Sequence, residues 1–178
     1  MLVSVVLMPF VASAQKKQLS QARDYIKSGK NLDKAESILR TQLQDSAQRN
    51  NIKVWQMLVE SLTAQYEQGN EQLYLKQKYD TLAFFTTTRK IFSAAESADS
   101  VDMRPDEDGR VHPKYRSHNA EYLRNIMPNL YYGGVYFVNK KDYKRASESF
   151  DHFISLPKQP IFTGVRLDTA STMVVRAA

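Results

Sequence analysis

The sequence contains no cysteine, and only six glycines and six prolines occur among its 178 residues. The lack of cysteine excludes disulfides, thiolate metal sites, a cysteine nucleophile and a lipid-modified amino-terminal cysteine. The scarcity of glycine and proline argues against a many-stranded sandwich with glycine-rich turns. The apolar stretch at the amino terminus stops at Gln15-Lys16-Lys17, well short of the ~20 residues that a transmembrane helix needs. We therefore expect a mainly helical chain with no transmembrane span.

Basic residues outnumber acidic residues in the sequence only moderately. The chain has 25 Lys and Arg residues against 19 Asp and Glu residues, which gives a formal net charge of +6. Basic runs such as Lys16-Lys17 and Lys140-Lys141 do not extend into the arginine-rich or aromatic-interleaved stripe of a nucleic-acid-binding surface. With 42% hydrophobic residues, the chain has the composition of one globular domain or a short repeat array. No nucleic-acid partner is expected.

Residues 1–14, MLVSVVLMPFVASA, carry no charge and end in Ala12-Ser13-Ala14. An apolar stretch that closes on small residues is typical of a secretory signal peptide. The positively charged start of such a signal is missing, and a buried amino-terminal strand or helical turn is the alternative. The pattern predicts a signal peptide over 1–14, cleavage near Ala14-Gln15, and export of the mature protein to the periplasm or the medium.

Apolar residues recur at helical spacing along most of the chain. The spacing predicts helices over 16–28, 31–43, 52–66, 71–98, 119–140 with a kink at Pro128, and 143–156. Asn31 is expected to cap the second helix, and Gln68-Gly69-Asn70 to end the third. The predicted domains are helical repeats over 15–98, a long charged loop over 99–118, a repeat with its preceding helix over 119–160, and the start of a further helix over 161–178.

The best-matched repeat lies between residues 130 and 157. Its residues Leu130, Gly133-Gly134, Phe137, Ala146, Phe150 and Pro157 follow the pattern W-x2-L-G-x2-Y, A-x3-F, P, so this segment resembles the tetratricopeptide repeat. Gly133 stands where the pattern has Leu. A weaker repeat over 16–45 places small and apolar residues at the same intervals, through Leu19, Ala22, Ile26, Ala35 and Leu39. Residues 52–98 resemble a degenerate unit.

The resemblance implies an all-α fold in which antiparallel helix pairs stack as a short right-handed α-solenoid. It also implies a non-enzymatic scaffold that binds a protein or peptide in the bacterial cell envelope. In this family the first helix of each pair lines the concave groove. The resemblance therefore places eight partner-binding residues there: Lys17, Ser20, Asp24 and Lys27 in the first unit, and Tyr131, Val135, Val138 and Asn139 in the best-matched one.

These two sets differ in chemistry. Lys17 and Lys27 suit a carboxylate or phosphate, and Tyr131 offers a flat apolar platform with a hydroxyl. A solvated helix face is the alternative interpretation of the first set. Because repeats bury their apolar faces on their neighbours, apolar residues near the carboxyl terminus predict further repeats or self-association at that end, namely Val165, Leu167, Met173, Val174 and Val175.

Recognisable catalytic motifs are missing: there is no G-x-S-x-G, no phosphate-cradling glycine loop and no H-E-x-x-H. We expect neither an enzyme nor a cofactor. The loop 99–118 gathers metal-ligand types, but their spacing fits neither an EF-hand nor a hydrolytic zinc site, so no metal is expected at Asp102, Asp106, Asp108, His112 and His118. The alternative function is an accessory domain of an enzyme, or a metal-binding module, that uses this loop.

The aromatic residues of the best-matched repeat recur at helical spacing. We expect most of them to be buried as core: Tyr131, Tyr132, Tyr136, Phe137, Tyr143, Phe150 and Phe153. His152, beside Asp151, is expected to face solvent.

The export prediction is tested on native material. Because cleavage follows the small-residue motif, intact-mass spectrometry of the protein from its own cells is expected to give a chain that starts at Gln15. A soluble cytoplasmic protein that retains residues 1–14 would contradict the signal peptide.

Overall fold

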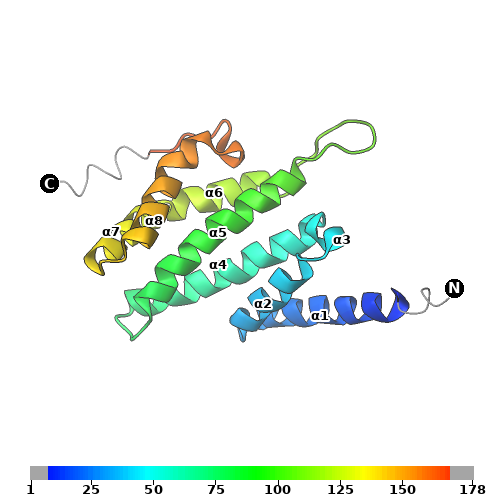
Figure 1. Ribbon diagram of the computed structural model, residues 1–178, viewed down its shortest axis with the longest axis horizontal. Coiled ribbons are helices and arrows are strands. Elements are labelled where there is room, and N and C mark those ends of the chain that lie inside the picture. Colours follow the sequence, from blue (N-terminus) through cyan, green and yellow to red (C-terminus); the bar gives the residue numbers. More distant parts are fainter. Residues whose placement is uncertain (1–7, 169–178) are drawn as a thin grey trace. The chain divides into compact units, whose positions relative to one another are not determined.

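The computed structural model describes residues 8–168, and every regular element in this range is helical (Figure 1). The chain divides into two compact units, Met1–Glu67 and Gln68–Ala178, which are described one at a time. The predicted all-helical class with packed helix pairs is confirmed for the described residues. The elements are α1 (Met8–Ser28), α2 (Leu32–Gln42), α3 (Ser46–Arg49), α4 (Ile52–Tyr74), α5 (Thr81–Asp102), α6 (Arg116–Ile126), α7 (Pro128–Asn139) and α8 (Tyr143–Ser155), followed by the 3-10 turns η1 (Leu156–Lys158) and η2 (Pro160–Phe162).

In the first unit, α1 and α2 pack as a helix pair. Ala22 of α1 and Ala35 of α2 are both fully buried, and such small side chains allow two helices to approach closely. The α4 helix is attached to α2 by polar contacts. Ser61 Oγ donates to the Leu32 carbonyl at 3.0 Å, and Gln65 Nε2 donates to the Glu36 carboxylate at 3.2 Å.

The first helix is longer than predicted, since α1 begins at Met8 rather than at Lys16. The predicted cleavage site therefore lies within α1, where Ser13 and Ala14 are exposed. Residues 1–7 of the predicted signal peptide lie outside the described residues.

Asn31 occupies the N-cap position of α2 as predicted, but it does not cap the helix through its side chain. Asn31 has a left-handed backbone, with φ of 54°, and its side chain accepts no capping hydrogen bond. Asparagine tolerates this conformation better than most residues, and the sharp turn after Gly29 requires it. The side-chain caps are carboxylates instead: Asp45 accepts from the Ala47 N–H at 2.9 Å, and Asp80 from the Leu82 N–H at 2.8 Å.

The prediction that Gly69 ends a helix is wrong, because α4 continues through Gly69 to Tyr74. A Cβ atom at Gly69 would lie 2.6 Å from the ring of Tyr79. The glycine therefore allows the Tyr79 ring to approach the helix. The next helix begins at Thr81, after the cap at Asp80, rather than at Glu71.

The second unit has the α7–α8 pair beside α5 and α6. A Cβ atom at Gly134 would lie 2.5 Å from the Phe150 ring, whereas one at Gly133 would lie 3.1 Å from the Phe85 ring of α5. The two glycines thus serve two different neighbours. Around them the core of the pair is formed by Leu130, Phe137, Ala146 and Phe153, which are all buried.

After α8 the chain turns back onto α5 and α6. Ile161 and Phe162 are buried, and η2 packs on both helices. The helix predicted from Leu167 is not found at Leu167 and Asp168, which lack regular structure. Its remaining residues, 169–178, lie outside the described range.

Gly134→Ala tests the close crossing of α7 and α8. The added methyl group would overlap the Phe150 ring, and overpacking of this kind costs about 1–3 kcal/mol, against a gain of up to about 1 kcal/mol in helix propensity. We expect a lower free energy of unfolding in urea denaturation.

The control is the same substitution in a Phe150→Leu background, where the smaller side chain leaves room. Equal losses in both backgrounds would show that Gly134 is not needed for Phe150.

Candidate functional site

The four α1 residues predicted to bind a partner lie exposed on one face. Lys17, Ser20, Asp24 and Lys27 follow one another at steps of three, four and three residues, and all four are exposed. Ala22 lies on another face of the same helix and is buried. The α1 face is therefore polar and accessible, and its interactions would be chiefly electrostatic.

The four predicted α7 residues are less alike. Val138 and Asn139 are exposed, while Tyr131 and Val135 are half-buried. The Tyr131 ring lies 5.6 Å from the ring of Phe150 and 5.8 Å from that of Phe153, centroid to centroid. Tyr131 thus joins α7 to α8 as well as facing outward. The α1 and α7 sets belong to different units.

One apolar residue next to this set was missed by the sequence analysis. Ile154 of α8 is 60% exposed and Val138 is 43% exposed. The buried row of α8 is Ala146, Ser149 and Phe153, and Ile154 falls outside that row. We use the name α7–α8 face for five apolar or aromatic residues of the two helices that are partly or largely accessible: Tyr131, Val135, Val138, Phe150 and Ile154.

The aromatic residues of the pair are less buried than predicted. Phe137 and Phe153 are fully buried, but Tyr143 is 66% exposed, so the expectation is wrong for Tyr143. It is the first residue of α8 and has no helix turn before it to cover it. The other four aromatic residues are half-buried: Tyr131, Tyr132, Tyr136 and Phe150.

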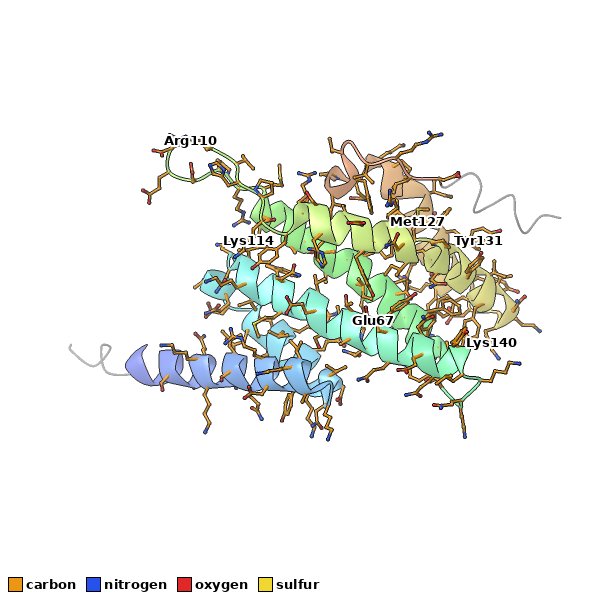
Figure 2. All side chains as sticks on the ribbon, turned by 180° about the vertical axis from the view of Figure 1, so that it is seen from behind. Glu67, Arg110, Lys114, Met127, Tyr131 and Lys140 are labelled. Atoms are coloured by element: carbon orange, nitrogen blue, oxygen red, sulfur yellow. The ribbon has the colours of Figure 1, made fainter. Side chains whose placement is uncertain are left out.

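The loop predicted over 99–118 is shorter, because α5 continues to Asp102 and α6 begins at Arg116. Asp102 Oδ2 accepts from the backbone N–H groups of Tyr115, at 2.6 Å, and Arg116, at 3.2 Å. Asp102 therefore caps α6 from the end of α5. Figure 2 shows Arg110 on the part of this loop that projects beyond the two helices.

Asp106 of this loop is engaged by the backbone. Asp106 Oδ1 accepts from the N–H groups of Asp108, at 3.0 Å, and Arg110, at 2.9 Å. Within residues 8–168 there is no group of three or more His, Asp or Glu side chains placed to hold a metal ion. The loop thus uses Asp102 and Asp106 to fix its own shape.

A cavity of about 290 Å³ lies between α5 and the segment after α8. Ser97 and Ser100 donate their hydroxyl protons to the carbonyls of Ser93 and Glu96, at 2.8 and 3.0 Å. Their lone pairs remain available as acceptors, so the cavity suits a group that donates hydrogen bonds. Its lining is Ser93, Glu96, Ser97, Asp99, Ser100, Gln159, Pro160 and Ile161.

The prediction that His152 faces solvent is wrong. His152 Nε2 lies 2.8 Å from Glu96 Oε1, and its ring packs against Phe92 with centroids 5.6 Å apart. The contact joins α8 to α5 across a long separation in sequence. It also gives Glu96 a partner at the edge of the cavity.

Asp99 is the most buried acid of the described residues, with 3% of its surface exposed. Burial raises the pKa of its carboxyl above the usual 3.8, Arg116 opposes that rise, and Asp102 adds to it. Arg116 Nε lies 3.5 Å from Asp99 Oδ1. Asp99 and Asp102, one helical turn apart, therefore both attach the end of α5 to the start of α6.

A second cavity, of about 260 Å³, lies on the α6 side. Arg116 and Arg124 line it together with Glu121, and Ile161 lines both cavities. The segment after α8 thus borders one cavity lined by Glu96 and Asp99 and another lined by Arg116, Arg124 and Glu121.

Comparison of the chain with models of known families, with curated proteins and with solved structures gives no match. None of the helices within residues 8–168 is long and apolar enough to cross a bilayer. The tetratricopeptide resemblance consequently depends on the residues of the sequence alone.

Asp99→Asn tests the buried carboxyl through pH. Because the pKa is higher in the folded state, the stabilisation linked to the bound proton is complete below pH 3.8 and is lost as pH rises through the folded pKa. The parent should therefore lose stability relative to Asp99→Asn as the pH rises above 3.8, measured by urea denaturation. Asp24→Asn, on the exposed α1 face, is the matched control for the loss of one carboxylate. A parent–variant difference that does not change with pH would contradict this account of Asp99.

Proposed function

We propose that this chain is a non-enzymatic helical-repeat scaffold, exported to the bacterial cell envelope, that binds a protein or peptide partner. In this proposal its helix pairs are tetratricopeptide-like units of a right-handed α-solenoid, and partner contacts come from the first helix of each pair.

Packing within the helix pairs supports the repeat interpretation. In α7–α8, Gly134 accommodates the Phe150 ring and Ala146 is buried, which are the roles that the small residues of the repeat pattern would have. In α1–α2, Ala22 and Ala35 are fully buried. Small residues thus lie inside both pairs at the matched positions.

The exposed apolar surface of the α7–α8 face carries the binding proposal. Val138 and Ile154 lie on different helices of one pair and are 43% and 60% exposed. Half-buried Tyr131 and Phe150, in contact with each other, add aromatic surface. Apolar side chains gathered on a packed pair favour an amphipathic helix or peptide as partner.

The α1 face would contribute differently. Lys17 and Lys27 flank Asp24 on an exposed helix surface, so a carboxylate or phosphate of the partner would pair with the lysines. Such exposed pairs contribute specificity more than affinity.

Val138→Asp tests the α7–α8 face. The charge would have to be buried against an apolar partner, so we expect the dissociation constant to rise at least about tenfold, which corresponds to about 1.4 kcal/mol. The measurement is titration calorimetry with the purified protein that the parent captures from envelope extract. Lys27→Glu tests the α1 face in the same assay.

Asn125→Asp is the matched control, because it adds the same charge to an exposed position of α6. Wild-type affinity in both Val138→Asp and Ile154→Asp would exclude the α7–α8 face as the binding surface. Tyr131→Ala is less informative, since it also removes contacts with Phe150 and Phe153.

A further inference from the structure

Two turns of the second unit place a lysine in a left-handed backbone conformation. Lys76, after α4, has a φ of 55°, and Lys141, after α7, has a φ of 59°. The other described residues with positive φ are Asn31 and the glycines at 29, 109 and 164. Glycine adopts this conformation without steric cost, whereas lysine does not. Lysine at both of these positions points to a role for its side chain.

The two turns have the same hydrogen-bond pattern. The Gln77 N–H donates to the Gln72 carbonyl at 2.8 Å, and the Asp142 N–H donates to the Phe137 carbonyl at 2.9 Å. Each lysine N–H donates three residues back, at 3.1 Å for Lys76 and 2.9 Å for Lys141. These are Schellman motifs, in which glycine is the usual residue at the left-handed position.

Both turns lie at one end of the second unit. The ring of Phe85, near the start of α5, lies against that of Tyr136, near the end of α7, with centroids 5.3 Å apart. The Lys140 ammonium lies 5.8 Å from the centroid of the same Tyr136 ring. Figure 2 shows Lys140 at the end of this unit where the turn between α4 and α5 also lies. The two turns therefore present their side chains on a common surface.

This surface combines positive charge with exposed apolar side chains. Its five lysines, 76, 78, 140, 141 and 144, are all exposed. Three exposed apolar side chains neighbour these lysines in the sequence: Tyr74 is 84% exposed, Leu75 is 53% exposed and Tyr143 is 66% exposed. We call these eight residues the lysine end.

Three acidic residues nearby lower this charge from five to two, or to three when Arg145, the partner of Asp142, is counted. Asp80 accepts from two N–H groups at the start of α5. Asp142 caps α8 and pairs with Arg145 at 3.1 Å. Glu71, one turn before Leu75, is exposed. Five lysines thus stand against Glu71 and two capping aspartates.

We propose that the lysine end binds an anionic lipid surface. Lysines near such a surface are attracted to the headgroups, and tyrosine and leucine insert at the level where headgroups meet acyl chains. An acidic protein would need complementary pockets for the apolar side chains. Tyr74 and Leu75, at the end of α4, and Tyr143, at the start of α8, instead lie exposed among lysines at helix ends, which suits insertion into a fluid, negatively charged surface.

The experiment compares binding of the full chain to phosphatidylglycerol and phosphatidylcholine vesicles by flotation, in about 0.1 M salt. We expect binding to the anionic vesicles only. The double variant Lys76→Gly, Lys141→Gly should bind them about tenfold more weakly. The same variant should unfold at a higher temperature, by about 2–4 °C for each substitution, because glycine relieves the left-handed lysines. Weaker binding in a more stable protein cannot result from misfolding.

Two further variants complete the test. Lys114→Gln with Lys158→Gln removes the same charge from exposed positions outside the lysine end, and should leave vesicle binding within about twofold. Tyr74→Ser with Leu75→Ser should weaken binding even in high salt, because it removes insertion rather than charge. Equal binding to both vesicle types, or unchanged binding by the glycine double variant, would overturn the proposal. So would lysine-dependent binding to polyglutamate without binding to vesicles, which would indicate a soluble acidic partner.

Discussion

The close crossing of α7 and α8 over Gly134 is the contact on which the second unit depends most. With no side chain at Gly134, the Phe150 ring occupies the space where a Cβ atom would lie. Phe150 then supports Tyr131, while Gly133 admits Phe85 of α5 on another side of α7. Val138 and Ile154 lie outside these contacts and remain exposed, so the α7–α8 face is accessible.

A second constraint holds α5 to α6. Asp102 supplies the cap that α6 lacks locally, and Asp99 pairs with Arg116 in a buried site. A buried carboxylate is costly unless its partners compensate it, and the raised pKa of Asp99 indicates that the compensation is incomplete. These contacts fix the end of α5 against the start of α6, where the loop between them begins and ends. Ile161 lines the cavity on each side of this junction.

The sequence predicted those elements whose boundaries are determined locally. The α7–α8 pair was found nearly to the residue, since a turn at Asp142 and the proline at 157 delimit α8. Gly69 and His152 were misjudged because their partners, Tyr79 and Glu96, are brought to them by tertiary packing. The predicted loop over 99–118 is too long for the same reason. Composition does not reveal that Asp102, at the end of α5, caps α6 on the other side of the loop. The exposure of Ile154 could be predicted only once it is known which row of α8 residues is buried.

The lysine end combines the turn of the α7–α8 pair with the turn between α4 and α5, whereas the α7–α8 face uses the sides of the α7–α8 pair. The Val138 backbone carbonyl accepts a hydrogen bond from the Lys141 N–H in the turn, whereas the Val138 side chain belongs to the α7–α8 face. The two proposed interactions can therefore be removed separately by substitution. Proteins retain locally unfavourable residues where function requires them. Both turns have a lysine in the left-handed conformation, whereas the turn after α1 has a glycine there. These lysines fit that rule if the turns, and not the helices, contact a charged surface.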